Sequence, residues 1–370
     1  MGGGNVEKMS KNVIYIDLDR EKRNTAGAKA PDDIAALCMQ RGYERFVVPN
    51  FPVNKNMIAK KVWLITECVK WWKKLEKRVT ESDIVIYQHP MYGKRISAKM
   101  IRRIRKKKGC QFIAVIHDLE SLRGGIEGVV NHNAKTDRFA DTELLMAFDK
   151  IICHNQAMKK YMTQMGFEEN RLINLKIFDY LGDYIRPIKK KEEKPTIAIA
   201  GNLAIGKCAY IYDLCSKSNN SNLKVNLYGI NFEERYNNEK RIVWNGSFRP
   251  EELPSHLKCD FGLVWDGNTG ATCAGNTGNY LRYNNPHKAS LYLSSGIPVI
   301  VWNQSALCDF VLENKVGIAV NDLYSLDKMI DEIDESTYVE MCRNAEKLAT
   351  RLHTGMYFYD ALDQILKSME

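Results

Sequence analysis

A helix with a basic pair in its first turn is predicted within the stretch RYNNPHKASLYLSSGIPVIV, residues 282–301. The helix should begin near Pro286, end at Gly296 and lead directly into a β-strand. The unpaired N–H groups and partial positive charge of a helix N-terminus form a binding site for phosphate. His287 would add a hydrogen-bond donor, and Lys288 a full charge. Alternatively, Lys288 is a solvated surface residue and His287 is a helix-start histidine with satisfied hydrogen bonds.

Two further turns could bind a ligand beside that helix. The sequence AGNLAIGK (200–207) follows a predicted strand and places Asn202 and Lys207 at a strand-to-helix turn, with a spacing unlike that of a Walker A loop. Tyr228 ends the next predicted strand, where an aromatic ring can stack on a flat base. Ordinary helix capping and turn chemistry would explain each turn alone. Because the carboxyl ends of parallel strands share one edge of a sheet, we expect the turns to lie together.

His117 and Asp118 end a predicted strand in the first half of the chain and could move a proton. A histidine titrates near neutral pH, and a carboxylate can either orient it or accept the proton itself. The alternative is that the pair only fixes the long loop after the strand. His89 and His154, at other strand ends, are weaker candidates for the base.

The elements that would position these residues follow from an alternation of short β-branched runs with helical patterns. This alternation predicts an α/β protein with parallel sheets covered by helices on both faces. Helices should begin near residues 31, 56, 97, 136, 155, 207 and 250 and at the basic pair, with Pro31 in a first helical turn. The predicted strands are 13–17, 46–48, 83–87, 112–116, 150–154, 172–175, 196–201, 224–229, 241–244, 260–265, 297–301 and 316–320.

A polar stretch bounded by two prolines, IRPIKKKEEKP, divides the alternation into two halves and is typical of a linker. We predict an N-terminal Rossmann-like domain over residues 1–184, a linker over 185–195 and a C-terminal Rossmann-like domain over 196–352. A C-terminal helix over 353–370 could pack back on the first domain. Two doubly wound domains of this kind would face each other across a cleft.

Composition excludes several classes of protein. The 370 residues are 45% hydrophobic and 27% charged, the balance of a soluble globular protein, with no apolar run long enough to span a membrane. Ten cysteines without a Cys-x-x-Cys pair indicate reduced thiols in a cytoplasm and argue against a zinc site. We therefore expect a cytoplasmic protein, which would lie at the inner face of the membrane if its surface binds lipid.

Charge is distributed unevenly along the chain. Residues 1–190 carry 36 Lys and Arg against 22 Asp and Glu, a net +14, whereas the remainder carries 18 against 23, a net −5. The basic half could face an anionic membrane surface or an acidic acceptor, while nucleic acid is disfavoured because no nucleic-acid-binding motif surrounds the charge. Residues 60–79 fit either an interfacial helix or an amphipathic helix that covers a sheet.

The motifs GNL, LYG, IHDLESLR and NNPHKASLYLSSGIPVIV together resemble bacterial glycosyltransferases of the GT-B fold. The similarity is to a family that includes glucosyltransferases acting on serine-rich adhesin glycans and β-1,6-galactofuranosyltransferases of surface polysaccharides. It extends over nearly the whole chain and is most specific in residues 282–301. The resemblance implies a UDP-sugar donor on the C-terminal domain and a glycan, lipid-linked or protein-linked acceptor on the N-terminal domain.

The resemblance also implies roles for individual residues. Asp309 would hold the ribose hydroxyls, because a ribose diol can donate two hydrogen bonds to a carboxylate. The first loop, residues 20–31, would approach the donor phosphates. The donor-binding residues implied in this way are Thr25, Gly27, Asn202, Lys207, Tyr228, Asn285, His287, Lys288 and Asp309, with Asn285, His287 and Lys288 on the diphosphate.

One departure from related enzymes bears on the mechanism. Many retaining GT-B enzymes carry two glutamates at positions that are Tyr283 and Leu291 here. Neither can act as a carboxylate, so we expect an inverting displacement with His117 or Asp118 as the general base. No metal or other cofactor is expected, since the helix dipole and Lys288 can stabilise the leaving group.

The predicted function is therefore transfer of a hexose, galactofuranose or glucose, from a UDP-sugar to a hydroxyl of a bacterial surface glycan or glycoprotein. Two alternatives remain open, namely a nucleotide-sugar epimerase on the same fold and a catalytically silent paralogue that binds a partner protein. The protein could also form a homo-oligomer. The intact phosphate-binding features around Lys288 favour an enzyme over the silent paralogue.

Overall fold

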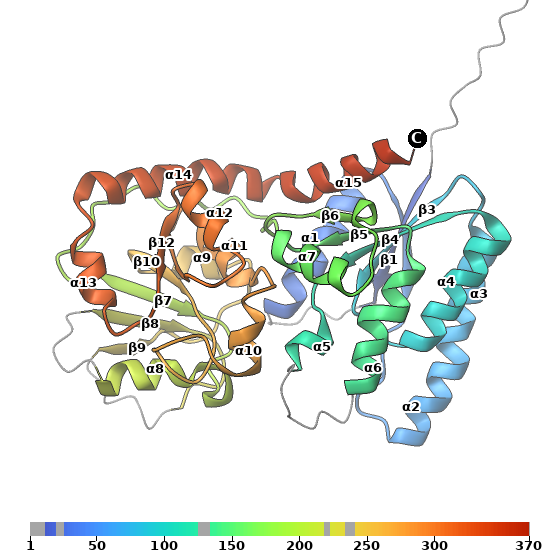
Figure 1. The fold of residues 1–370 in the computed structure, drawn as a ribbon, viewed down its shortest axis with the longest axis horizontal. Helices are drawn as coiled ribbons and strands as arrows, with labels where there is room; N and C mark the ends of the chain where they lie inside the picture. The colour runs from blue at the N-terminus through green and yellow to red at the C-terminus, as the bar shows by residue number, and fades with distance from the viewer. Residues whose placement is uncertain (1–11, 20–25, 125–133, 218–222, 234–240, 370) are drawn as a thin grey trace, which may run out of the picture.

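Two parallel six-stranded sheets lie side by side in the structure, a computed structural model that describes residues 12–19, 26–124, 134–217, 223–233 and 241–369 (Figure 1). All twelve predicted strands are present, and the predicted α/β architecture with two sheets is confirmed. The strands are β1 Val13–Leu18, β2 Glu44–Val48, β3 Ile84–His89, β4 Gln111–Ile116, β5 Lys150–Cys153, β6 Leu172–Asn174, β7 Thr196–Ala200, β8 Lys224–Tyr228, β9 Ile242–Trp244, β10 Phe261–Val264, β11 Val299–Trp302 and β12 Gly317–Val320.

Strand order defines where each sheet can bind a ligand. The first sheet has the order β2-β1-β3-β4-β5-β6, and the second has the order β12-β11-β10-β7-β8-β9. In the second sheet the order reverses between β7 and β10, which are neighbours although β8 and β9 lie between them in the chain. Doubly wound sheets bind ligands outside the carboxyl ends of the strands at such a reversal point.

Helices cover both sheets. They are α1 Ala26–Gln40, α2 Met57–Trp63, α3 Val69–Arg78, α4 Lys94–Lys108, α5 Glu120–Arg123, α6 Ala134–Phe139, α7 Gln156–Gln164, α8 Ile205–Lys217, α9 Leu253–His256, α10 Gly275–Tyr280, α11 His287–Ser294, α12 Cys308–Glu313, α13 Leu326–Asp331, α14 Glu335–His353 and α15 Met356–Ser368. Asn56 and Asn155 cap α2 and α7 with their side-chain oxygens, as expected for helices that begin there.

The prediction that Pro31 starts a helix is wrong. Helix α1 begins at Ala26, so Pro31 lies inside it and Gly27 lies in its first turn rather than in a loop. Because proline has no N–H group, Pro31 cannot donate to the carbonyl of Gly27. Tertiary packing of the buried face, which includes Ile34 and Leu37, outweighs this missing hydrogen bond.

The segment predicted as one amphipathic helix behaves differently along its length. Residues 57–78 run through α2, a π-helical turn over Leu64–Cys68, and α3. Trp72 and Leu75 in α3 are fully buried, so this part covers the sheet. Val62 and Ile65 are more than half exposed, so the first part presents apolar side chains to solvent.

Helix α11 is anchored to the second sheet by Tyr292. The Tyr292 hydroxyl accepts a hydrogen bond from the N–H of Ala200 (2.8 Å) and donates to the carbonyl of Ala198 (3.1 Å), both in β7. Its ring occupies the space above Gly262 in β10, where a Cβ atom would lie 2.1 Å from the Tyr292 Cγ. The helix is therefore held against both strands of the reversal point.

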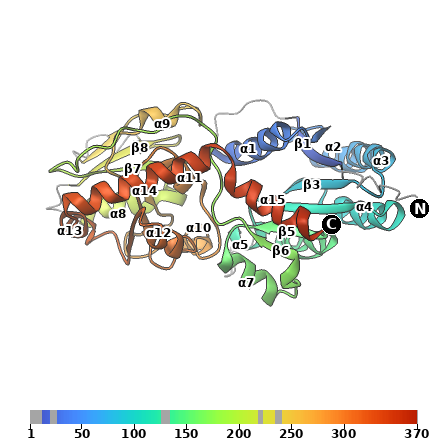
Figure 2. The same cartoon turned by 90° about the horizontal axis from the view of Figure 1, so that it is seen from above.

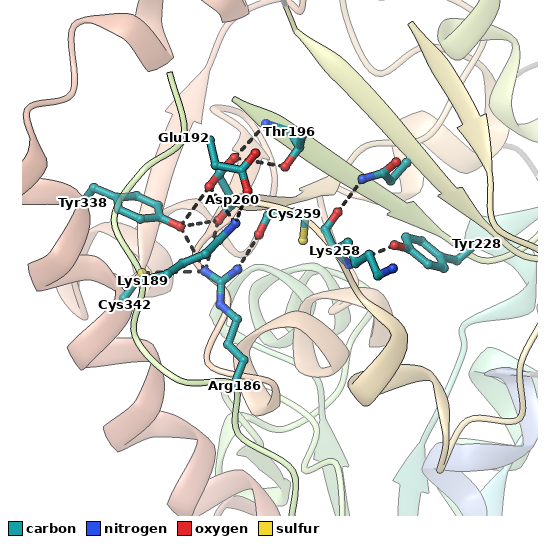
Figure 3. Close-up of polar contacts among 11 residues, drawn as sticks. Arg186, Lys189, Glu192, Thr196, Tyr228, Lys258, Cys259, Asp260, Tyr338 and Cys342 are labelled. Atoms are coloured by element: carbon teal, nitrogen blue, oxygen red, sulfur yellow. Dashed lines mark hydrogen bonds and ion pairs between the residues drawn. The ribbon is translucent and has the colours of Figure 1, made fainter. Parts of the chain in front are cut away.

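The predicted linker is fastened to the second sheet instead of running freely over the surface (Figure 3). Arg186 is buried and donates to the carbonyl of Cys259 and to the hydroxyl of Tyr338 (3.1 Å). Lys189 lies 3.2 Å from the fully buried Asp260 carboxylate, which also accepts from the N–H of Thr196 (2.8 Å). Burial of a charged group requires partners of this kind, and they fix the chain where it enters β7.

The chain returns to the first sheet at its end. Helix α14 runs along the second sheet, and α15 continues over the first, where it contacts β5 and β6 (Figures 1 and 2). Asp179 accepts hydrogen bonds from the N–H groups of Tyr357 (3.2 Å) and Phe358 (2.7 Å) at the start of α15. The domain boundaries themselves stay a prediction.

Gly229 is required where β7 and β8 end side by side. Its φ of 148° is unfavourable for other residues, and a Cβ atom there would lie 1.7 Å from the carbonyl oxygen of Gly201. We expect Gly229→Ala to lower the free energy of unfolding by on the order of 3 kcal/mol, measured by urea denaturation. Gly206→Ala in α8 is the matched control, because its Cβ would meet nothing within 4 Å. Equal stability of the two variants would contradict this role of Gly229.

Candidate functional site

A cleft of about 450 Å³ lies at the carboxyl ends of both sheets. The first half of the chain contributes residues after β4 and from α1, and the second half contributes the ends of β7, β8 and β10 and the start of α11. The cleft thus includes the reversal point between β7 and β10. Of the predicted site residues, it brings together His117, Asp118, Asn202, Lys207, Tyr228, Asn285, His287 and Lys288.

Lys288 is a buried, paired cation in this cleft. Its Nζ donates to the carbonyl of Trp265 (2.8 Å) and to Oδ1 of Asp266 (2.9 Å). The side chain is only 11% exposed, so the alternative of a solvated surface lysine is wrong. Burial alone would lower the pKa of the Lys288 ammonium group, but the Asp266 carboxylate together with other nearby groups raises it above its usual value. Lys288 is therefore positively charged beside the N-terminus of α11.

His287 adds no charge to this helix start. Burial, together with the nearby charge of Lys29, lowers the pKa of its ring to about 4. The ring stacks on Tyr180 with centroids 5.1 Å apart and forms a hydrogen bond with the backbone of Asp179. A neutral histidine packed in this way shapes the cleft wall, while Lys288 carries the charge.

Asn285 joins the two halves of the molecule. Its Nδ2 donates to the carbonyls of His154 (2.6 Å) and Lys176 (3.0 Å), and its Oδ1 accepts from Nδ2 of Asn155 (2.7 Å). The residue is 3% exposed, and its own backbone N–H donates to Nδ1 of His154 (3.0 Å). The predicted diphosphate contact by this side chain is therefore not seen, because its donors and acceptor already have partners.

His154 has a structural role rather than the role of a base. Its Nδ1 accepts from the N–H of Asn285, so the proton of the neutral ring is on Nε2, which lies 3.1 Å from the carbonyl of Ile116. Burial lowers the pKa of His154 to about 3. His89 is fully buried against Asp141 (3.1 Å), away from the cleft. Both weaker candidates thus fill structural positions.

The two turns predicted to lie beside α11 are at the cleft, but their side chains make other contacts than expected. Asn202 accepts from the N–H of Ala204 (3.1 Å), which shapes the start of α8, and Lys207 lines the cleft. Tyr228 is 1% exposed, and its hydroxyl accepts from the N–H of Lys258 (2.9 Å; Figure 3). The half-buried Phe248, with its ring centroid 6.4 Å from that of Tyr228, is the more accessible aromatic ring.

Two predicted donor-binding residues, Asp309 and Gly27, are not among the described residues that line the cleft. Asp309 is exposed on α12 and is not among the cleft-lining residues, because α12 follows β11 rather than a strand of the reversal point. Gly27 lies in the first turn of α1, and Thr25 lies outside the described residues. The next turn of α1 reaches the cleft instead, where Lys29 donates to Oδ1 of Asp33 (2.6 Å).

The two base candidates, His117 and Asp118, differ in their contacts and in their exposure to the cleft. His117 Nε2 lies 2.7 Å from Oε1 of Gln88, and its ring stacks on Phe178 with centroids 5.7 Å apart. Asp118 has a side chain 29% exposed and lines the cleft. Burial raises the pKa of Asp118, and the guanidinium of Arg123, 2.9 Å away, partly offsets that rise. A carboxylate with a raised pKa and access to the cleft is suited to accept a proton.

Asp266 and Tyr280 are among the cleft residues that the sequence did not reveal. Both border a stretch in which the tetrapeptide GNTG occurs twice, at 267–270 and 275–278. The repeated Gly, Asn and Thr residues after strand β10 were a signal of close backbone packing. At Gly278 a Cβ atom would lie 2.9 Å from the carbonyl oxygen of Asp266.

The described part of the chain lacks two kinds of feature. Within it, no three His, Cys, Asp or Glu residues are grouped so that they could hold a metal ion. None of the described helices is both long and apolar enough to cross a membrane.

Comparison with known proteins gives consistent matches. Residues 12–177 match a family model described as "Glucosyltransferase 3-like, N-terminal domain", and residues 197–365 match "Glucosyltransferase 3-like, C-terminal domain". The chain is 30% identical over 361 residues to beta-1,6-galactofuranosyltransferase WbbI of Escherichia coli strain K12, covering 96% of this chain and 98% of WbbI. It is 23% identical over 290 residues to glucosyltransferase 3 of Streptococcus gordonii, covering 77% and 80% of the two chains.

Solved structures show the same fold. Sucrose-phosphate synthase from Thermosynechococcus elongatus superimposes with a TM-score of 0.63 at 12% identity, covering 97% of this chain and 100% of the synthase. At that level of identity the likeness concerns the fold alone. The expected GT-B arrangement of two doubly wound halves around a cleft is thereby confirmed.

His154 makes stability depend on pH in a defined direction. Its pKa is about 3 in the folded protein and about 6.5 when unfolded, so between these values the unfolded chain binds more protons and stability falls as pH falls. We expect His154→Gln to be destabilised at pH 7.5, and the gap to wild type to narrow by up to about 1.4 kcal/mol per pH unit below pH 6.5. Urea denaturation between pH 7.5 and 4.5 measures both.

Asn155→Ala is the control for this prediction, because it removes a neighbour in the same cluster without removing a titrating group. Its stability curve should run parallel to that of wild type. A gap between His154→Gln and wild type that stayed constant with pH would show that the folded-state pKa of His154 is not lowered.

Proposed function

We propose, because this chain belongs to the glucosyltransferase 3-like family of glycosyltransferases, that it transfers a hexose from a UDP-sugar to a hydroxyl of a bacterial surface glycan or glycoprotein. Membership of this family confirms the resemblance inferred from the sequence motifs. The relatives' names point to galactofuranose or glucose as the hexose. The observation that carries the proposal is the buried cation Lys288 at the N-terminus of α11, inside the cleft between the two sheets.

The donor would lie on the second sheet. Its diphosphate would meet the free N–H groups at the start of α11 and the ammonium of Lys288, with Lys207 nearby at the start of α8. The nucleoside would extend toward the ends of β7 and β8, where Phe248 offers an aromatic face. Asp266 holds Lys288 in place when no phosphate is bound.

We propose inversion with Asp118 as the general base. The acceptor oxygen attacks the anomeric carbon, the bond from that carbon to the UDP oxygen breaks, and the acceptor proton passes to the Asp118 carboxylate. UDP leaves as an anion stabilised by Lys288 and the α11 dipole. Leu291, one of the positions where retaining relatives carry glutamate, lines the cleft and supplies no carboxylate. The stereochemistry of the product tests the inversion.

The test of the donor site is release of UDP from a panel of UDP-hexoses, with EDTA present, with and without a GlcNAc-bearing acceptor. We expect acceptor-dependent release for wild type. For Lys288→Met we expect a loss on the order of 100-fold or more in kcat/KM, because the buried positive charge that stabilises the leaving group is removed. Lys328→Met is the control, since Lys328 is a highly exposed lysine on α13.

The outcomes separate the proposal from its rivals. Donor conversion without an acceptor would favour an epimerase, and UDP-sugar binding without any turnover would favour a silent paralogue. Full activity of Lys288→Met would contradict the placement of the diphosphate at α11. Activity lost in EDTA and restored by a divalent cation would contradict the proposal that no metal is required.

We further propose that the enzyme works at the cytoplasmic face of a membrane, which its first half contacts through the start of α2. Five apolar side chains gather there, each more than half exposed: Val53, Met57, Ile58, Val62 and Ile65. Residues 46–66 contain Lys55, Lys60 and Lys61 and no acidic residue. Helix α2 lies at the edge of the molecule, away from the second sheet (Figure 1).

Charge favours an anionic lipid surface as the occupant of this apolar and basic patch. A two-fold contact between copies of the chain would set the lysines of both patches against each other, which opposes association. An anionic bilayer accepts the apolar side chains and attracts the lysines, each by about 1 kcal/mol. A lipid-linked acceptor would be presented at the same surface.

Vesicle flotation tests the patch. We expect wild type to float with phosphatidylglycerol vesicles but not with phosphatidylcholine vesicles. Ile58→Ser/Ile65→Ser should bind at least ten-fold more weakly, because it removes two apolar side chains that would be buried in the bilayer. Val243→Ser/Leu312→Ser, which changes two exposed apolar residues of the second half, is the control. A wild-type protein that floats with neither kind of vesicle would overturn the membrane contact. A wild-type oligomer that Ile58→Ser/Ile65→Ser dissociates would also overturn it and would favour a homo-oligomer.

A further inference from the structure

Tyr280 connects the two halves of the molecule at the proposed base. It lies at the end of α10, in the second half of the chain, and is 4% exposed. Its hydroxyl accepts a hydrogen bond from the N–H of Leu119 (2.9 Å), 161 residues earlier in the chain. The carboxylate of Asp118, the residue directly before Leu119, lies near the same hydroxyl, which lowers the pKa of that carboxylate. The hydroxyl thus holds the backbone immediately after Asp118.

We infer that Tyr280 is a positioning residue for Asp118, so that the base of the first half is correctly oriented only when the second half supplies this hydroxyl. The inference rests on the proposed function, because it assumes that Asp118 accepts the acceptor proton. It assigns to Tyr280 a role in the chemistry although the residue need not touch either substrate.

The backbone around α10 supports this role. Asn276 in α10 donates from Nδ2 to the carbonyl of Gly124 (2.9 Å), at the end of α5, so two side chains of one short helix hold the loop that carries Asp118. Helices α10 and α5 also pack on each other. The contact between the halves is therefore built at this loop and is not limited to one hydroxyl.

The same segment reaches the proposed donor site. It begins at Asp266, which pairs with Lys288, and it ends at Tyr280. Within it, a Cβ atom at Gly278 would lie 2.6 Å from the carbonyl carbon of Cys273, and one at Gly267 would lie 2.5 Å from the carbonyl oxygen of Ala274. Such close backbone packing makes the segment stiff, so the position of Tyr280 is tied to the position of the Lys288 partner.

The groups that face Asp118 decide the direction of the effect. Burial raises the pKa of Asp118 most, and the charge of Glu120 raises it further. Arg123, the Tyr280 hydroxyl and the charge of Lys207 lower it. Tyr280 itself stays protonated, because burial raises its own pKa well above the usual 10. Removing the hydroxyl therefore takes away one of the interactions that favour the carboxylate, and the pKa of Asp118 should rise.

The experiment compares Tyr280→Phe with wild type in the pH profile of kcat/KM for acceptor-dependent UDP release. A general base must be ionised, so we expect the acidic limb of the profile to move to higher pH by on the order of 0.5–1 unit, the effect of one hydrogen bond. The dissociation constant for UDP, measured by titration calorimetry, should stay within about two-fold of wild type, since that range is below 0.5 kcal/mol. UDP binding also shows that the variant is folded.

Tyr338→Phe is the matched control. Tyr338 is also a buried tyrosine whose hydroxyl is hydrogen-bonded, but its partners are Arg186 and Asp260 at the opposite end of the second sheet. Its loss should lower thermal stability without moving the pH profile. A merely structural Tyr280 would behave in the same way.

The outcomes keep this inference apart from the proposed function. If wild type shows no acceptor-dependent UDP release, the proposed function fails and the inference fails with it. If wild type is active, Asp118→Asn is inactive and the acidic limb of Tyr280→Phe does not move, the inference alone is overturned. If Asp118→Asn stays active, Asp118 is not the base and Tyr280 cannot act through it.

Discussion

A buried ammonium group at the start of α11 is the constraint on which the arrangement of the cleft depends. Burying such a group costs several kcal/mol unless it is paired and hydrogen-bonded. Lys288 meets this requirement through the Trp265 carbonyl and the Asp266 carboxylate, so β10 has to end beside the start of α11. Tyr292 and Gly262 hold the helix there. The strand order then places the end of β7, with Asn202, at the same edge.

Two carboxylates in the cleft differ in their exposure and therefore in their chemistry. Asp266 is 6% exposed and paired with Lys288, so it balances a charge. Asp118 is more exposed, and its partner Arg123 is itself in contact with solvent. Asp118 lines the cleft, where it could accept a proton from a second substrate. A closely packed segment joins Asp266 to Tyr280, whose hydroxyl holds the backbone beside Asp118. The proposed donor and acceptor sides of the cleft are thus connected through the backbone.

Several polar residues near the cleft hold the two halves together through hydrogen bonds. Asn285 and His154 exchange hydrogen bonds across 131 positions of sequence, with the imidazole kept neutral by burial. Asp179 caps α15 as the chain crosses back to the first sheet. Such residues occupy the same sheet edges as functional ones, so their type and position in the sequence do not distinguish the two roles.

The twelve strands, the two-sheet architecture and the helix that carries Lys288 could be predicted from the sequence, because hydrophobic periodicity and helix-start signals are local properties. Three facts required the folded structure: Asn285 has its hydrogen bonds satisfied by His154, Lys176 and Asn155, Asp309 does not line the described cleft, and Tyr280 binds the backbone beside Asp118. These facts depend on how two sheets face each other. Contacts between residues more than a hundred positions apart follow from packing of the whole chain, and no local pattern encodes them.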